Sequence, residues 1–568
     1  MSRIDERMAG LSRDRHRAPR RPGLGEIALD LTAQDPDREV IRDGERRLTR
    51  GDMLDMALRL GGAFERMGLS PGAPIAFQLP NWWEAAVINL ACALFGYRIV
   101  PLLPIYRKAE LQVILPACGV EAIFLPPASD KVDHPAIVAA LDAPPSHVVT
   151  VRGDAPGAAR FDDLIAGPPA EPRLPDSRDA KIVIFTSGST GRPKGVVHTH
   201  LGVQAKATAD FLLCLDMKRD DRHLWMTDMG WVMGPLTLLS VLLSGSTLVL
   251  AEGAPSMPGD PFRLLRLASE MEVTHLGVAP TLVRQFMTQD TESLSGYDLS
   301  SLRIVASTGE PWTEDAWLWQ LDHICRRRAV PLNISGGTEL FGAILTSTVL
   351  HELKPGGFSA QALGVGAKVL RQDGSEAAPG EVGELVVTQP PLGLTPAIRG
   401  DRDRYLDTYW STFPGLWRHG DWVRCDPDGT WYILGRSDDT LNIAGKRIGP
   451  PEIEAALTET GEVVDAAAIA APDDIKGVAV VCVCVAAPNV SPDAELVNRL
   501  KDRVGEIVSK PFRPREIHFV EALPKTRSMK TMRRVVRAAF LGEDPGDLSS
   551  ISNPETIQPI ADLQKEKS

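Results

Sequence analysis

The stretch that decides the fold is KIVIFTSGSTGRPKG, which runs from Lys181 to Gly195. A short, mostly apolar strand leads directly into a loop of glycines and hydroxyl side chains that ends at Lys194. Glycines let backbone amides approach an anion closely, hydroxyl groups add hydrogen-bond donors, and a lysine supplies a positive charge. The loop is not a Walker A motif, because Pro193 stands where that pattern needs glycine and no Ser or Thr follows the lysine. A loop of this kind after a strand predicts a phosphate-binding site.

Strands and helices alternate on both sides of this loop. Before it, a helical pattern over residues 51–69 is followed by the strand-like PIAFQL (74–79) and by a second helical pattern over residues 81–97. A second series of the same kind runs from residue 181 to about residue 350. Strands that alternate with helices of this length predict βαβ units and mostly parallel sheets with helices on both faces.

The pattern changes after the KPGG segment at 354–357. Short β-rich pieces separated by DG and PG turns predict a small β subdomain, and helices and strands alternate again after Arg436. We therefore expect an α/β protein with a large N-terminal domain over residues 1–436, made of two βα-layered subdomains and the β subdomain. A mobile α+β C-terminal domain is expected over residues 437–545, followed by a loose polar tail over residues 546–568.

Composition narrows the function. The chain has 568 residues, 62 Lys+Arg against 74 Asp+Glu, and a formal net charge of −12, so nucleic acids and anionic membranes are not expected partners. The uncharged stretch 231–251 is interrupted by Gly-Pro and by a Ser-Gly-Ser-Thr turn, which predicts helix, turn and strand rather than a membrane span. Seven scattered cysteines and the lack of a visible targeting segment favour the cytoplasm.

Six motifs in order resemble those of the AMP-forming adenylate superfamily, which includes acyl-CoA synthetases, nonribosomal adenylation domains and luciferases. They are TSGSTGRPKG (186–195), GEP (309–311), GTE (337–339), WRHGD (417–421), GRSDDTLNIAGKRIGPPEIE (435–454) and LPKTRSMKTMRRVVR (523–537). The resemblance covers about residues 30 to 540. It implies a ligase that joins a carboxylic acid to coenzyme A through an acyl-adenylate, with ATP, Mg²⁺ and CoA as cofactors and co-substrates.

The resemblance also implies a role for individual residues. Catalytic roles fall to Lys530, Lys194, Thr338 and Glu339, and Glu339 would help to hold Mg²⁺. The positions that match nucleotide-binding ones are Thr186, Ser187, Gly188, Ser189, Thr190, Gly191, Gly309, Glu310, Pro311, Ser335, Gly336, Gly337, Asp421, Arg436 and Arg447. Asp438 matches the hinge about which the family's C-terminal domain rotates, and Ala444, Gly445 and Lys446 match the path of the CoA arm.

The sequence says less about which carboxylic acid is the substrate. The segment Trp231, Val232, Met233 and Gly234 resembles the acyl-binding segment of ligases for short-chain, medium-chain and cyclic acids. An FDxS-like aspartate that would bind an amino group is absent, which weighs against a nonribosomal adenylating enzyme, since an unpaired ammonium is costly to bury. The alternative of an aryl-acid adenylating enzyme stays open. His198 and His200 offer an H-x-H spacing, but without an evident third ligand we expect solvated or capping roles.

Two departures from the family pattern bear on the first half-reaction. Ser335 stands where the family has an aromatic residue that stacks on adenine, and base stacking on an aromatic ring contributes about 1–3 kcal/mol. Met529 stands where the usual PKTRSGK pattern has glycine, directly before Lys530. These changes raise an alternative: an enzyme specialised for thioester formation, supplied with acyl-adenylate by a companion ligase. That division resembles the paired ligases of platensimycin-type diterpenoid antibiotic biosynthesis. A pseudoenzyme that senses acyl-adenylate is disfavoured by Lys530 and the intact phosphate loop.

Overall fold

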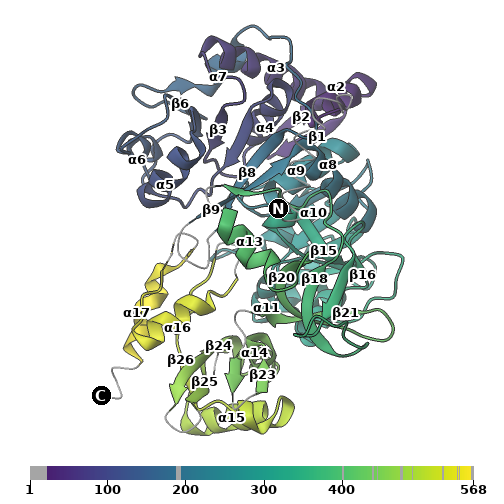
Figure 1. Ribbon diagram of the computed structural model, residues 1–568, viewed down its shortest axis with the longest axis vertical. Helices are drawn as coiled ribbons and strands as arrows, with labels where there is room; N and C mark the ends of the chain where they lie inside the picture. The colour runs from purple at the N-terminus through teal and green to yellow at the C-terminus, as the bar shows by residue number, and fades with distance from the viewer. Residues whose placement is uncertain are drawn as a thin grey trace.

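The computed structural model describes residues 22–186, 193–399, 402–437, 441–443, 446–473, 477–488, 490–526, 530–546, 548 and 551–563. Ser187–Arg192, Asp438, Ala444, Gly445 and Met529, on which several sequence predictions fall, lie outside these ranges, as do the side chains of Lys446 and Arg447. The described chain forms two large sheets, a small antiparallel sheet and a C-terminal α+β block (Figure 1). The expected mixed α/β fold with a large N-terminal and a smaller C-terminal part is confirmed.

The first large sheet contains the strand that precedes the phosphate loop. Its central strands are parallel, and β9 turns back antiparallel to β8 so that Thr186 lies opposite Lys194. In spatial order the strands are β19 (Ile398–Arg399), β9 (Lys194–Thr199), β8 (Ala180–Thr186), β4 (Arg98–Pro101), β3 (Pro74–Phe77), β5 (Ala122–Leu125), β6 (His147–Thr150) and β7 (Ala159–Arg160).

The second large sheet is parallel from β14 to β1, and its outer strands β15, β16 and β2 pair antiparallel with their neighbours. In spatial order its strands are β16 (Ala360–Gln361), β15 (Gly342–Thr346), β14 (Val330–Gly337), β13 (Ile304–Ser307), β12 (His275–Val278), β10 (Arg222–Trp225), β11 (Thr247–Leu250), β1 (Glu39–Asp43) and β2 (Arg46–Thr49).

Helices fill the space between the two sheets and cover their outer faces, so that apolar faces of all layers are buried. The shared layer holds α2 (Leu24–Gln34), α3 (Arg50–Arg66), α4 (Trp83–Phe95), α8 (His200–Ala207), its π-helical continuation η1 (Thr208–Cys214) and α9 (Met233–Ser244), with α7 (Phe161–Ala166) beside α3. The outer face of the first sheet packs on α5 (Lys108–Cys118) and α6 (His134–Ala139). The outer face of the second packs on α10 (Arg263–Glu270), α11 (Pro280–Met287), η2 (Thr291–Gly296), α12 (Glu314–Trp319) and η3 (Gln320–Ile324).

Two local features show why the shared layer forms where it does. Thr49 and Asp52 exchange hydrogen bonds in a capping box, which satisfies backbone amides at the start of α3. Gly61 lets α3 approach α4 closely, because a Cβ at this position would lie 1.9 Å from the ring of Phe95. In α4 the residues from Glu84 to Phe95 are all buried, which explains why its sequence shows no polar face.

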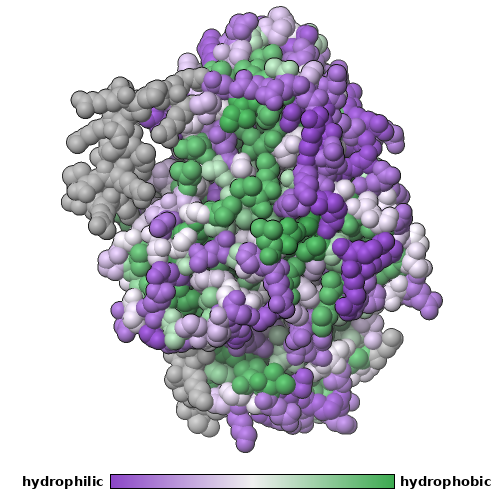
Figure 2. All heavy atoms as spheres, turned by 90° about the vertical axis from the view of Figure 1, so that its right-hand side faces the viewer, coloured by the Kyte–Doolittle hydropathy of each residue, from purple (hydrophilic) through white to green (hydrophobic). Residues whose placement is uncertain are grey.

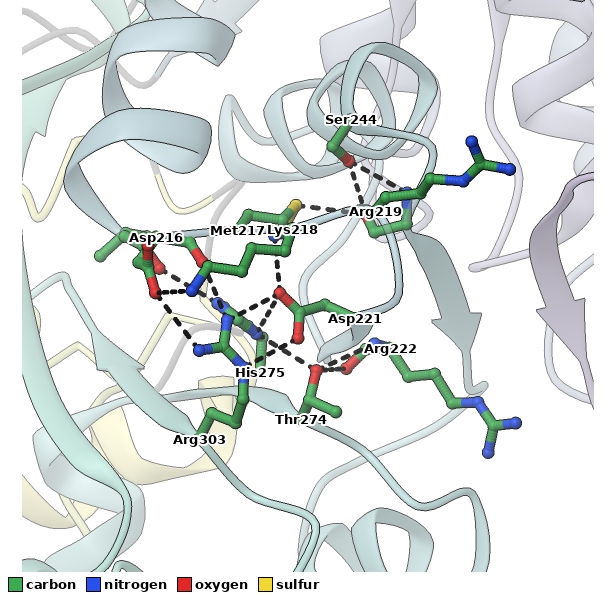
Figure 3. A network of polar contacts seen from close by, with 12 residues as sticks. Asp216, Met217, Lys218, Arg219, Asp221, Arg222, Ser244, Thr274, His275 and Arg303 are labelled. Atoms are coloured by element: carbon green, nitrogen blue, oxygen red, sulfur yellow. Dashed lines mark hydrogen bonds and ion pairs between the residues drawn. The ribbon is translucent and has the colours of Figure 1, made fainter. Parts of the chain in front are cut away.

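A polar network locks the amino ends of β10, β12 and β13 together (Figure 3). Asp221, just before β10, accepts hydrogen bonds from Nε and Nη2 of Arg303 at 3.0 and 2.9 Å. Its Oδ2 lies 3.5 Å from Nδ1 of His275 at the start of β12. This network fixes the edge of the sheet opposite the carboxyl ends of the same strands, so it supports the site from behind without taking part in it.

The small antiparallel sheet confirms the β-rich region predicted after residue 357. Its strands are β17 (Ala367–Leu370), β18 (Val382–Val387), β20 (Trp417–Cys425) and β21 (Trp431–Arg436), and α13 (Arg402–Trp410) packs on β20.

The C-terminal block has its own two apolar layers on either side of a three-stranded sheet. The sheet consists of β24 (Val463–Asp473), β25 (Gly477–Ala486) and β26 (Glu516–Phe519), beside the hairpin of β22 (Leu441–Ile443) and β23 (Lys446–Ile448). One face packs on α14 (Pro450–Thr458), α15 (Ala494–Ile507) and η5 (Lys510–Phe512), the other on α16 (Arg533–Leu541), η6 (Pro554–Thr556) and α17 (Ile557–Asp562).

The expectation of a loose tail is wrong for residues 551–563. This segment forms η6 and α17, which pack beside α16 at the lower left of Figure 1. Ile560 is fully buried and Ile551 is 5% exposed. The tail is ordered because its few isoleucines bury apolar surface on the C-terminal sheet, which a mostly polar composition conceals.

On the face shown in Figure 2, hydrophobic side chains gather in a band down the upper middle, with polar side chains on both sides. The described large hydrophobic residues that are exposed come from separate segments, among them Val113, Leu213, Leu350 and Leu392. No helix within the described ranges is both long enough and apolar enough to cross a bilayer. The expected helix, turn and strand over residues 231–251 are confirmed as α9 and β11.

Candidate active site

A cavity of about 220 Å³ lies between the carboxyl ends of β13 and β14, the strands β20 and β21, and the C-terminal block. Segments that are more than 200 residues apart in the sequence meet here, as Gly309 and Lys530 do. The predicted site residues that line it are Gly309, Glu310, Pro311, Ser335, Gly336, Asp421, Arg436 and Lys530. The topology explains the placement, because the carboxyl ends of parallel strands share one edge of a sheet.

Glu310 fixes the loop that follows β13. Both of its carboxylate oxygens accept a hydrogen bond from Thr281 at 2.7 Å, and Oε2 accepts a second from Arg284 at 2.8 Å. Burial tends to raise the pKa of Glu310, but the charges of Arg284 and Lys525 and the hydrogen bonds from Thr281 and Arg284 together lower that pKa overall. Gly309 precedes it at φ 101°, a backbone conformation that glycine adopts without strain. Glu310 is therefore a charged anchor for the cavity wall.

Asp421 lies on β20 directly opposite Arg436 on β21. Its carboxylate is 3.5 Å from Nη1 of Arg436 and 3.5 Å from Nε2 of His419, and the aspartate is 7% exposed. Burial lowers the pKa of His419, so this ring stays neutral at pH 7. The arrangement presents the carboxyl oxygens of Asp421 to the cavity beside a cation, which suits hydrogen bonds to the hydroxyl groups of a ligand.

Glu339, Lys194 and Tyr409 form a compact charged group behind His419. The Nζ of Lys194 donates to Glu339 Oε1 and to the hydroxyl of Tyr409, each at 2.6 Å, and the tyrosine donates to the same Oε1 at 2.6 Å. Burial would raise the pKa of Glu339, yet the charge and hydrogen bond of Lys194 and the bond from Tyr409 bring it down to about 2. Glu339 is therefore ionised at every pH at which the fold is expected to persist.

His419 separates the group of Glu339, Lys194 and Tyr409 from the cavity. A Cβ placed on Gly337 would lie 3.1 Å from both Glu339 Oε2 and His419 Cε1, and His419 lines the cavity. Because Lys194 and Tyr409 both contact Oε1, the other carboxylate oxygen is the one that faces toward Gly337.

A single carboxylate fits the Mg²⁺ that the family uses. Within the described ranges no group of three His, Cys, Asp or Glu side chains could hold a metal on its own. Mg²⁺ bound in nucleotide sites takes one or two carboxylates and completes its shell with phosphate oxygens and water, so Glu339 alone is a sufficient protein ligand.

The turn that carries Glu339 is held from behind by a buried ion pair. Lys206 and Asp210 lie one helical turn apart, with Nζ and Oδ1 2.7 Å apart and side chains 2% and 0% exposed. Lys206 donates to the carbonyl of Ala343 at 2.8 Å, and Asp210 Oδ2 accepts from the amide of the same residue at 2.7 Å. Between Glu339 and Ala343 the backbone turns through Phe341 at φ 52°. Both main-chain groups of Ala343 are thus clamped by charged side chains, which fixes where the turn ends.

His198 supports the same turn from β9. Its Nε2 donates to the carbonyl of Thr338 at 2.7 Å, and the ring is 1% exposed. The expected solvated or capping role is wrong for both histidines of the H-x-H pair, since His200 is also fully buried. The N-cap of α8 is Thr199, which lies between them.

Ser335 supplies no aromatic face, as the sequence indicates, and its neighbours cannot. A Cβ on Gly336 would lie 1.9 Å from the carbonyl oxygen of Gly342, so only glycine fits there. Among the described lining residues, Trp312 and Phe358 are the aromatic residues besides His419. Trp312 is held in place by a 2.9 Å hydrogen bond from its Nε1 to Ser307.

The predicted acyl segment lies at the start of α9, outside the cavity lining of the described chain. Trp231 packs against the apolar cluster that contains Leu103 and Phe185, while Val232 and Met233 pack against the core of the shared helical layer. Gly234 is required by its contacts, because a Cβ there would lie 2.5 Å from Cα of Met229.

The C-terminal block brings two more cations to the cavity besides Arg436. Arg533 lines it while it forms a bidentate ion pair with Glu454, at 2.6 and 2.5 Å. Lys530 is exposed toward the cavity from a short hairpin. The two domains therefore meet in an arrangement that places the C-terminal lysine beside Asp421 and the β13 loop.

Comparison with known proteins settles the family. The AMP-binding enzyme family matches residues 30–396, and the AMP-binding enzyme C-terminal domain matches residues 452–530. The chain belongs to the AMP-binding enzyme family. This membership accounts for the six motifs and for the meeting of the lysine hairpin with the nucleotide-side residues in one cavity.

Curated relatives of this AMP-binding enzyme are acetyl-coenzyme A synthetases. That of Chlorobaculum tepidum is 30% identical over 92% of this chain and 82% of its own length. That of Mycobacterium bovis is 33% identical over 91% of this chain and 84% of its own length. The chain is thus an AMP-forming acid–thiol ligase that uses ATP, Mg²⁺ and CoA.

Solved structures agree with the fold. The acetoacetyl-CoA synthetase from Streptomyces lividans superposes with a TM-score of 0.86 at 26% identity, over 96% of this chain and 87% of that chain. An anthranilate CoA ligase in complex with anthranoyl-AMP superposes with a TM-score of 0.83 at 22% identity, over 94% of this chain and 99% of that chain, and this likeness concerns the fold alone.

Several site residues are missed by reasoning from sequence. No local sequence signal marks these residues, which are Tyr409, His419, Arg284 and the Lys206–Asp210 pair. The hydrogen-bonding partners of Tyr409, Arg284 and Asp210 lie 26 to 215 residues away in the sequence. The place of His419 beside Gly337 is visible only in the assembled fold. An i,i+4 Lys–Asp spacing could have been noted, but it is also typical of an exposed helix face.

Proposed function

We propose that the cavity is where a carboxylic acid reacts with ATP to form an acyl-adenylate, which the same enzyme then converts to a CoA thioester. The observation that carries the proposal is that Lys530 lines the same cavity as Asp421 and Arg436. A cation from the C-terminal block is thereby aimed at a site whose other wall carries a buried carboxylate suited to ribose hydroxyl groups.

The chemistry explains why these charges are needed. A carboxylate oxygen attacks the α-phosphorus of ATP, the bond to pyrophosphate breaks, and negative charge gathers on the α-phosphate. Lys530 would stabilise that charge, and Lys194 with the preceding loop (186–191) would bind the β- and γ-phosphates. Mg²⁺, held by Glu339, would neutralise phosphate charge. Thr338, which precedes Glu339 in the sequence, would help to orient the phosphate groups of ATP.

The second half-reaction needs a different set of residues. The thiol of CoA attacks the acyl carbon, its proton leaves to solvent, and AMP departs with the bonding electron pair. Under the proposal, Ala444, Gly445 and Lys446 line the path of the CoA arm, Arg447 lies near the nucleotide, and Asp438 is the hinge between domains that meet at residues 436 and 437.

The proposal for the acid rests on two features. The relatives at 30% identity or more are acetyl-CoA synthetases, and a solved relative is an acetoacetyl-CoA synthetase. In this chain the small side chain of Ser335 lines the cavity where the family resemblance implies an aromatic residue, so the cavity is wider at this position than an aromatic side chain would allow. We therefore propose acids larger than acetate, with Trp231, Val232, Met233 and Gly234 shaping the acyl site.

The test is isotope exchange between pyrophosphate and ATP with a panel of acids, which reports adenylation alone. Acetate, acetoacetate, medium-chain acids, benzoate and a cyclohexane carboxylate cover the proposed size range. Exchange with at least one acid larger than acetate, and its loss in Lys530→Ala, is the expected result. Exchange with acetate only would contradict the proposed size of the acid.

A second candidate function rests on Ser335, which removes the stacking surface for adenine. An enzyme that adenylates poorly would act on acyl-adenylate from a companion ligase, as in a specialised pathway such as antibiotic biosynthesis. Thioester from synthetic acyl-adenylate and CoA, with no pyrophosphate exchange for any acid, would select this candidate. For location we propose the cytoplasm, because all seven cysteines are free and six of them are buried.

A further inference from the structure

The hairpin that carries Lys530 is held by hydrogen bonds within the hairpin and by hydrogen bonds from the C-terminal tail. Residues 525 and 531 pair as antiparallel neighbours, and Thr526 donates its amide to the carbonyl of Lys530 at 2.9 Å. The amide of Lys530 in turn donates to the hydroxyl of Thr526 at 3.1 Å. Both main-chain groups of Lys530 therefore depend on the position of Thr526.

Residues 551–553 of the C-terminal tail add a third strand to this hairpin. Ile551 pairs with Thr526, and the amide of Ser552 donates to the carbonyl of Lys525 at 2.7 Å. The side chain of Asn553 spans the hairpin's entering strand: its Oδ1 accepts from the amide of Lys525 at 2.8 Å, and its Nδ2 donates to the carbonyl of Leu523 at 2.8 Å. A side chain that satisfies a donor and an acceptor two residues apart fixes the backbone between them.

The tail that supplies these bonds is itself anchored at some distance from the site. Ile560 is fully buried in an apolar cluster with Val536 and Phe540 of α16 and with Val481 of β25. This buried anchor holds the tail on the C-terminal block, and the polar residues that precede it in the sequence, Ser552 and Asn553, contact the hairpin.

The opposite side of the hairpin is fixed by charge. Lys525 is 6% exposed, and its Nζ contacts Asp465 of β24 at 2.7 Å and donates to Thr531 at 2.7 Å. Lys525 is thus a buried residue that links the hairpin to β24. Lys530, five residues later, is the lysine that lines the cavity.

We propose that residues 551–563 form a positioning element for Lys530, with Asn553 as the residue that sets the register of the lysine hairpin. The inference rests on the proposed role of Lys530 in adenylation. It predicts that the tail serves the first half-reaction and is dispensable for the second, because thioester formation does not use Lys530. A tail that only stabilised the domain would affect both half-reactions alike.

The test uses the full chain with Asn553→Ala, and Gln558→Ala as the matched control. Gln558 lies on the same tail, is exposed, and bonds only to Asp562 among the described residues. Pyrophosphate exchange with the acid reports the first half-reaction, and thioester formation from synthetic acyl-adenylate and CoA reports the second. A displacement of a catalytic group by about 1 Å costs on the order of 100-fold in rate.

We expect Asn553→Ala to lower the exchange rate by about 10- to 100-fold while thioester formation stays within about twofold, and Gln558→Ala to change neither. Asn553→Asp, which keeps the acceptor for Lys525 and loses the donor to Leu523, should recover part of the exchange rate. Equal slowing of both half-reactions, or no slowing of either, would overturn the proposal.

Limited trypsin digestion gives a readout that does not depend on activity. The sequence between residues 523 and 531 contains three trypsin sites, after residues 525, 527 and 530. Cleavage there should be faster in Asn553→Ala than in the wild type or in Gln558→Ala at equal melting temperature. If the wild type shows no exchange with any acid, the proposed function fails in its first half, while unchanged trypsin cleavage in the variant would separately refute the positioning role.

Discussion

Tyr409 is the residue whose role is clearest from contacts alone. Its hydroxyl lies 2.6 Å from both Lys194 and Glu339, while its ring stacks on Trp417 with centroids 4.0 Å apart and planes 7° apart. The ring therefore belongs to the core and the hydroxyl to the charged group. The two roles can be separated by removing one oxygen atom.

Tyr409→Phe should leave folding nearly intact and impair adenylation. The stack on Trp417 is kept, whereas two hydrogen bonds to charged groups are lost, at roughly 1.5–3 kcal/mol each before compensation. We expect kcat/KM for acid and ATP to fall about 10-fold or more, measured by pyrophosphate exchange. Tyr432→Phe, outside this group, is the control. An unchanged kcat/KM would show that Tyr409 does not hold Lys194 and Glu339 for catalysis.

The ionisation of Glu339 predicts a pH dependence of stability. Its pKa is lowered from 4.5 to about 2 in the fold, so its contribution is fully present above pH 4.5 and is lost as the pH falls toward 2. The contribution is on the order of 3 kcal/mol. Free energies of unfolding of the wild type and Glu339→Gln should therefore differ by a constant amount between pH 7 and 5 and converge below pH 4.5. A constant difference down to pH 3 would contradict the assigned pKa.

At the scale of elements, the turn after β14 depends on the Lys206–Asp210 pair. Removing one partner of a buried ion pair leaves an uncompensated charge and costs about 3–5 kcal/mol. Asp210→Asn should lower the free energy of unfolding in urea by about 3 kcal/mol. Asp55→Asn breaks an exposed pair with the same i,i+4 spacing, Arg59–Asp55, and should cost below about 1 kcal/mol. Similar costs at the two sites would show that burial does not set the contribution.

Most helices and strands were predictable from the hydrophobic periodicity of the sequence and from the glycine and proline residues that end the elements. Strand β8 before the glycine-rich loop, helix α9 and strand β11 over residues 231–251, and the β-rich region after residue 357 all follow from local signals. The ordered tail did not, because Ile557 and Ile560 are sparse in the sequence and their partners lie in α16 and β25.

The site was predictable only where a motif carries it. Gly309, Asp421, Arg436 and Lys530 meet in one cavity as the motif order implies. Tyr409 could not be found, since the link from α13 to β9 spans 215 residues. The burial of His198 on β9 was also missed, because alternation in a strand does not reveal that both faces of the first sheet are covered by helices. His200 begins α8 and is buried with that helix in the shared layer.

At the scale of the whole molecule, buried neutral histidines should make the protein sensitive to mild acid. Burial lowers the pKa of His134 and His198 to about 4 and that of His200 and His223 to about 3. Between pH 6.5 and these values the unfolded chain binds protons that the folded chain does not, so stability falls as the pH falls.

The slope is up to about 1.4 kcal/mol per pH unit for each such histidine. We expect the free energy of unfolding to decrease from pH 6.5 to pH 5, a window above most carboxylate titrations. His200→Asn should be less stable at pH 7 but should show a shallower slope by about one histidine. The same slope in the variant and the wild type would mean that His200 is protonated in the fold.

We propose above that one cavity, completed by Lys530, makes the acyl-adenylate whose acyl group the enzyme then transfers to CoA. Mass-spectrometric detection of acyl-CoA tests it most directly, with the acid panel supplied either as acid, ATP, Mg²⁺ and CoA or as synthetic acyl-adenylate and CoA. We expect thioester by both routes in the wild type, and by the acyl-adenylate route alone in Lys530→Ala. Thioester from acyl-adenylate but from no acid with ATP in the wild type would contradict it.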